Sequence, residues 1–198
     1  MELTYTIERD LKEAAAMAEA LVPYVYENEL YGKAGSNMPS LTVGALLLRL
    51  RRLRALQESM TTQQRGELEQ IEASHQAVRK EWRQHYEKKL AWEAESRLKA
   101  MDPYFQECRE MPQLCANAYL PEALRRTIVN EIMLEMDALS MPLNHLERLA
   151  QTTDSHLHNI NQPCDFIWDT VLQPVYPQET YWWLYQRPPQ PDSDTPAN

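Results

Sequence analysis

Glu72 and His75 have the Glu-x-x-His spacing that di-iron carboxylate bundles use for two of their metal ligands. Such a centre also needs a second Glu-x-x-His pair and two further glutamates on other helices. His145, His156 and His158 each lack a glutamate three residues earlier in the chain. Because His75 also falls at an apolar position of a helical pattern, we interpret it as a half-buried structural histidine and predict no metal ion here.

Three cysteines, Cys108, Cys115 and Cys164, are further candidates for chemistry, and His156 and His158 lie close to the last of them. Structural zinc sites use tighter, paired spacings such as Cys-x-x-Cys. A thiol nucleophile would need a histidine base, and no flanking signature supports one. Each cysteine is therefore interpreted as a small buried hydrophobe, with a site assembled in three dimensions as the alternative.

Glu131 and Glu135 are four residues apart on a stretch with helical spacing, which also carries Asp137. Paired carboxylates can do acid–base work. The same turns carry Arg125 and Arg126, so the pattern favours a solvated charged face instead.

A basic block, made of Arg49, Arg51, Arg52 and Arg54, stands among leucines. It could bind an acidic protein partner, a nucleic acid or an anionic membrane surface. Four arginines are few for membrane binding, at about 1 kcal/mol each, and a net charge of −9 argues against nonspecific nucleic-acid binding. The alternative is that these arginines pair with the chain's own acidic stretches, residues 8–29 and 107–137.

The loop over residues 32–40 precedes a predicted helix, and helix N-termini attract anions. Its polar residues could complete a phosphate or carboxylate site, although they are not in P-loop order. Ser40 is the predicted N-cap of the helix that follows. The alternative is an ordinary loop between helices. The residues of this possible anion site are Lys33, Ser36, Asn37 and Ser40.

The most distinctive local cluster is aromatic and comprises Tyr181, Trp182, Trp183 and Tyr185. Tryptophan and tyrosine are common anchors of protein interfaces, so this segment could dock on another chain or exchange between two copies. The alternative is that it covers the helical body of its own chain.

The elements that must position these residues are helices. The chain has 4 glycines among 198 residues, whereas sheets and hairpins need glycine at their turns. Between Pro39 and Pro103 there is no proline, and strong helix formers dominate. The predicted fold class is therefore all-α: a helical bundle with a long helical hairpin over about residues 41–101. We place its break near residues 60–66, where Thr61 and Gln64 have capping-box spacing.

The remaining elements follow from periodicity and proline positions. We expect a first helix over 7–31 that is kinked or restarted at Pro23, and a short helix from Pro103 that Pro112 closes. Further helices are predicted over 121–140 and from 143 to about 160. The predicted domains are a bundle over 1–162, an aromatic extension over 163–187 with a short helix near 166–172, and a disordered tail over 188–198.

The N-terminus lacks the basic start and apolar run of a signal peptide, and the cysteine number is odd. These features predict a soluble protein of the reducing cytoplasm with free thiols and without a transmembrane segment.

The leading functional hypothesis is a non-catalytic helical interaction protein, such as an adaptor, assembly factor or oligomeric scaffold. It implies a protein partner or self-association, and no catalytic residue, metal or cofactor. The first alternative is a ligand- or metal-binding bundle, or an enzyme, whose site assembles from Glu72, His75, the histidines after residue 144 and Cys164. The second is a regulator that contacts nucleic acid or membrane through the basic block.

Overall fold

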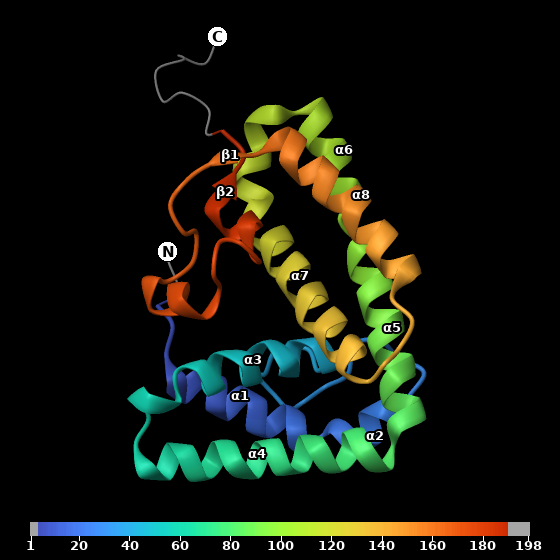
Figure 1. Cartoon of the computed structure of the whole chain (residues 1–198), viewed down its shortest axis with the longest axis vertical. Helices are drawn as coiled ribbons and strands as arrows, with labels where there is room; N and C mark the ends of the chain where they lie inside the picture. Colours follow the sequence, from blue (N-terminus) through green and yellow to red (C-terminus); the bar gives the residue numbers. More distant parts are fainter. Residues whose placement is uncertain (1–3, 190–198) are drawn as a thin grey trace.

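Prolines stand in the first turns of the two helices that begin at Asp102 and Pro112 in the structure, a computed structural model that describes residues 4–189 except the Gln113 side chain. Within that range the all-α class is confirmed (Figure 1). The α-helices are α1 (Ile7–Glu19), α2 (Leu21–Tyr26), α3 (Val43–Ala55), α4 (Thr62–Glu81), α5 (Arg83–Lys99), α6 (Asp102–Glu110), α7 (Pro112–Ala138) and α8 (Asn144–Ile160). Short 3-10 helices are η1 (Gln57–Ser59), η2 (Thr170–Val175) and η3 (Trp182–Tyr185).

Helices α1, α3 and α4 lie side by side in one layer, with α1 between the other two (Figure 1). The chain reverses between α3 and α4, and the predicted capping box is present there: Thr61 Oγ1 accepts from the Gln64 amide, and Gln64 accepts from the Thr61 amide. A second bend at Trp82 starts α5, which leaves the layer at a steep angle. The tract over 41–101 therefore contains three α-helices, α3, α4 and α5, and α1 packs between the first two of them.

Helices α5, α7 and α8 build the second part of the molecule, and α6 lies at its far end (Figure 1). The predicted helix over 121–140 begins earlier, at Pro112, and Pro121 lies inside it. A proline there removes one backbone hydrogen bond, from its own position to the carbonyl of Asn117. Both residues are exposed, so water can satisfy the free carbonyl and the helix continues.

The segment after α8, residues 161–189, runs back along α7 towards the N-terminal layer (Figure 1). Two two-residue strands, β1 (Gln162–Pro163) and β2 (Gln186–Arg187), pair antiparallel and close it into a loop. The short helix predicted near 166–172 is found as η2, about four residues later. We call residues 161–189 the strap. Of the predicted disordered tail over 188–198, residues 190–198 lie outside the described residues.

The prediction of free thiols is wrong for Cys108 and Cys115, which form a disulfide with Cα atoms 4.9 Å apart. The turn at Pro112 between α6 and α7 brings the two side chains together, although they are seven residues apart in sequence. Both cysteines are buried, and Cys164 is free. Among the described residues, no helix is both long enough and apolar enough to cross a membrane.

Candidate partner-binding groove

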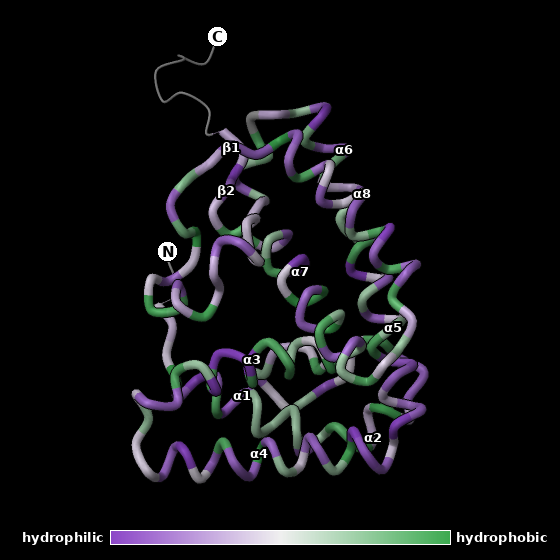
Figure 2. Tube along the Cα trace, in the orientation of Figure 1, coloured by the Kyte–Doolittle hydropathy of each residue, from purple (hydrophilic) through white to green (hydrophobic). Residues whose placement is uncertain are grey.

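The first three arginines of the basic block point into the molecule and are used there. Arg49 donates from Nε to Glu13 at 2.8 Å, and Asp10 lies within ion-pair distance of both Arg49 and Arg52, at 3.9 and 3.7 Å. Burial outweighs the two arginines and raises the pKa of Asp10 above its usual value. The hydropathy of the chain shows α3 as an apolar helix with hydrophilic turns towards its C-terminal end (Figure 2).

Arg51 and Arg52 also hold the strap in place. Arg51 reaches Glu131 of α7 at 3.6 Å and lies 4.8 Å from the centre of the Tyr181 ring. Arg52 donates to the Tyr176 hydroxyl at 2.9 Å. Arg54, the most exposed of the four, pairs with Glu72 of α4. The alternative of pairing with the acidic stretches over 8–29 and 107–137 thus describes Arg49, Arg51 and Arg52. The partner of Arg54 lies outside both stretches.

The N-terminus of α3 already binds an anion, and that anion is a side chain of this protein. Thr42, not Ser40, caps the helix and accepts from the Ala45 amide at 3.0 Å. The fully buried Glu93 of α5 accepts from the Gly44 amide at 2.8 Å and from Arg97 at 2.8 Å. Ser40 fails as a cap because the backbone is still extended there and pairs Leu41 with Gly32.

The other residues of the predicted anion site, Lys33, Ser36 and Asn37, lie exposed in the loop before α3. The amides that would attract an anion are at Gly44 and Ala45, which Glu93 and Thr42 occupy. A Cβ atom on Gly44 would lie 2.6 Å from Ile128 of α7, so the close approach of three helices needs glycine there.

The aromatic cluster of the strap packs on α7. Trp183, only 1% exposed, donates from Nε1 to Thr127 Oγ1 at 2.9 Å, and its carbonyl accepts from the Tyr119 hydroxyl at 2.6 Å. Tyr181 is fully buried and donates to Glu131 at 2.6 Å. Burial raises the pKa of the Glu131 carboxyl above its usual value. The solvated face predicted for Glu131 is therefore wrong.

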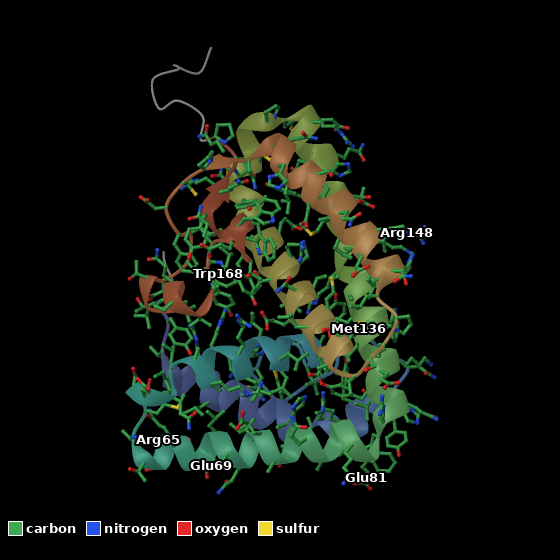
Figure 3. All side chains as sticks on the ribbon, in the orientation of Figure 1. Arg65, Glu69, Glu81, Met136, Arg148 and Trp168 are labelled. Atoms are coloured by element: carbon green, nitrogen blue, oxygen red, sulfur yellow. A yellow bond between two sulfur atoms is a disulfide. The ribbon has the colours of Figure 1, made fainter. Side chains whose placement is uncertain are left out.

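Trp182 and Tyr185 complete the strap's contacts. The half-buried Trp182 stacks on His158 of α8 with ring centres 3.8 Å apart, and the Tyr185 hydroxyl donates to the Tyr176 carbonyl at 2.8 Å. Nearer the chain's start, the Asp169 carboxylate accepts from the Tyr5 amide at 2.8 Å. Trp168 lies near α3 (Figure 3), and the Arg52 guanidinium is 5.1 Å from its ring centre. The strap is thus held by the segment before α1 and by α3, α7 and α8 of its own chain.

His75 is the end of a buried hydrogen-bonded row that links α4, α5 and α7. Its Nε2 lies 2.8 Å from the Tyr86 hydroxyl, which lies 3.3 Å from a Glu135 carboxylate oxygen, and Arg79 pairs with Glu135. The Nδ1 atom of His75 has no partner among the described residues. Burial, then the positive charges of Arg54 and Arg79, lower the pKa of His75 to about 4.

This pKa makes His75 an acid-sensitive point of the fold. The folded state binds the His75 proton only near pH 4, whereas the unfolded chain binds it near pH 6.5, so stability falls as the pH drops between those values. The full loss is about 3 kcal/mol. We expect His75→Gln to be less stable than the parent at pH 7 and to lose less further stability between pH 7 and 4. Urea unfolding at pH 7, 5.5 and 4 measures this difference, and parallel curves for both proteins would contradict it.

The other candidate ligands do not gather. His145 lies on the surface of α8, 3.7 Å from Glu95, while His156 packs edge-on against Phe105. His158 stacks on Trp182, and Cys164 donates to the Asp165 carbonyl. Across residues 4–189, no three His, Cys, Asp or Glu side chains converge on a point where a metal ion could bind.

A groove of about 600 Å³ lies between α1 and α4. Gln64 at the start of α4 donates to Glu8 at the start of α1, at 3.0 Å, so the two helices run parallel along it. Its floor contains the buried side chains of Leu11, Ala18 and Ile71. Arg65, Glu69 and Glu81 mark the outer edge of α4, where side chains project away from the body (Figure 3).

The rim of the groove repeats with a helical period on both sides. On α1 it is formed by Glu8, Lys12, Ala15 and Glu19, and on α4 by Gln63, Glu67, Gln70 and Ser74. Each row has steps of four, three and four residues, which is the spacing of positions along one edge of a packed helix. A further helix that lay between α1 and α4 would contact both rows.

The sequence did not point to this groove. Glu8, Lys12 and Glu67 resemble ordinary solvated helix residues, because pairing of α1 with α4 is a long-range event. The sequence contained one signal of the groove: α4 carries a single seam of four buried residues. Most of the surface of this helix therefore faces away from the core. Those seam residues are Leu68, Ile71, His75 and Val78.

The chain was compared with protein-family models, curated proteins and solved structures, and none of them matches it.

Proposed function

We propose that this is a non-catalytic helical interaction protein that binds a protein partner through the α1–α4 groove. The groove carries the proposal, because it combines an apolar floor with two polar rims at helical spacing. Recognition of a partner helix in a groove between helices uses that combination. The basic block and the aromatic strap make their contacts within the chain. They therefore leave the groove as the surface proposed for a partner.

The two alternatives receive less support from the contacts. A site made of His75, His156, His158 and Cys164 would need these side chains to converge, and each has a different neighbour. A nucleic-acid or membrane contact through the basic block would need arginines that are free of acidic partners, and Arg49, Arg51 and Arg54 are paired.

The Cys108–Cys115 disulfide bears on where such a partner would be met. Cytosolic glutathione and thioredoxin keep most thiols reduced, so disulfides persist mainly in oxidising compartments. This bond therefore supports an oxidising compartment rather than the cytoplasm that the sequence predicted.

The groove is tested with a variant that fills it. Ala15→Trp places a large side chain on the rim of the groove, while Gln151→Trp places the same side chain on the exposed surface of α8. We expect proteins that co-purify with the parent to be retained by Gln151→Trp and depleted about tenfold or more by Ala15→Trp, as for loss of a central contact. Equal recovery with all three proteins would contradict the proposal.

A further inference from the structure

The unbalanced charge of the α1–α4 groove says what kind of helix it can bind. Its lining holds three glutamates, Glu8, Glu19 and Glu67, against one lysine, Lys12. Within residues 4–189, none of these glutamates lies within ion-pair distance of a basic side chain. Elsewhere, the acidic residues around the basic block are paired inside the fold. The groove therefore presents acceptors that a cationic partner can use.

The small residues of the groove determine how closely a partner helix can approach. Ala15 and Ser74 stand on the rims, and Ala18 lies on the floor, so three small side chains line the half of the groove nearer Glu19. Small residues let two helix backbones come close together. The 13 residues of α1 span about 20 Å, which is roughly four turns of a partner helix.

We infer that the partner segment is a basic amphipathic α-helix, with small or leucine side chains facing the groove floor and lysine or arginine at both edges. This inference rests on the proposed function and adds the chemistry of the partner. Nucleic acid and anionic lipid do not fit, because the same three glutamates would repel them. An acidic helix is excluded for the same reason.

The inference is tested with the full chain and synthetic peptides. The probe is an 18-residue amphipathic peptide of Leu, Ala and Lys with blocked ends. One comparison peptide carries Glu in place of every Lys, and another has the same composition in an order without an apolar face. We expect the basic amphipathic peptide to bind at least about tenfold more tightly than either comparison peptide in fluorescence anisotropy, and less tightly as salt is added.

Charge reversal locates the binding. Glu19→Lys/Glu67→Lys changes the groove, and Glu107→Lys/Glu147→Lys makes the same change of net charge at exposed positions on α6 and α8. Each reversal removes an attraction to the basic peptide and adds a repulsion, so we expect the groove variant to bind the peptide about tenfold more weakly. The control variant should keep the affinity within about twofold. Equal weakening by both variants would mean diffuse attraction to an acidic chain and would overturn the inference.

The inference and the proposed function fail in different ways. Absence of peptide binding, or equal binding of the acidic peptide, overturns the assignment of a basic helix. If Ala15→Trp still depletes a co-purifying protein in that case, the groove remains the partner site and only the partner's chemistry is wrong. If Ala15→Trp depletes nothing and the peptide does not bind, both fail together.

Discussion

Trp183→Ala is expected to lower the free energy of unfolding by about 3–5 kcal/mol, the usual cost of deleting a buried tryptophan side chain. Trp183 is 1% exposed, donates to Thr127, and has the Arg126 guanidinium 4.1 Å from its ring centre. The change leaves a cavity between the strap and α7 and removes the hydrogen bond to Thr127. Chemical unfolding followed by circular dichroism measures the loss.

The neighbouring Trp182 is the matched control, since it is half-buried and its ring stacks on His158 at the surface of α8. Trp182→Ala should cost about 2 kcal/mol, as for loss of its two aromatic pairs, with His158 and Trp183. Equal losses for the two variants would show that the strap does not pack as described.

The second large effect is expected at Glu93. Glu93→Ala removes the carboxylate that accepts from the Gly44 amide and from Arg97, and it leaves a buried arginine without its partner. Removing one member of a buried ion pair costs about 3–5 kcal/mol. Glu93→Gln keeps the shape and the acceptor for Gly44, so its cost should be smaller.

The control for Glu93 is another glutamate of α5 that pairs with a basic residue four positions later in the chain. Glu95 pairs with Lys99 at the exposed surface, so Glu95→Ala should leave the stability almost unchanged. If Glu93→Ala were equally harmless, the joint between α3 and α5 would not depend on the carboxylate. Unfolding in urea at pH 7 is the measurement.

Local signals allowed much of the helical pattern to be predicted. Thr61 and Gln64 form the capping box that their spacing indicated, and Pro103 stands in the first turn of α6. These features depend on neighbours within one turn, which the sequence displays directly. Where a longer-range contact decided, prediction failed: pairing of Gly32 with Leu41 moved the start of α3 beyond Ser40.

The candidate site was less predictable, because its residues are unremarkable until two helices meet. Ala15 could equally have been a core residue, and Glu67 resembles an ordinary solvated position. The buried pair of Glu93 and Arg97 was also hidden, since an acidic residue four positions before a basic one is common on exposed helices. Only the packing of α3 against α5 makes that pair internal.

Hydrogen exchange of the protein alone and with a protein that co-purifies with it tests the central claim most directly. The claim predicts slower exchange over residues 8–19 of α1 and 61–74 of α4, with little change in the strap. Ala15→Trp, mixed with the same partner, should show no such protection. Protection confined to residues 163–187, or to the surface around Arg54, would contradict the claim and place the partner elsewhere on the molecule.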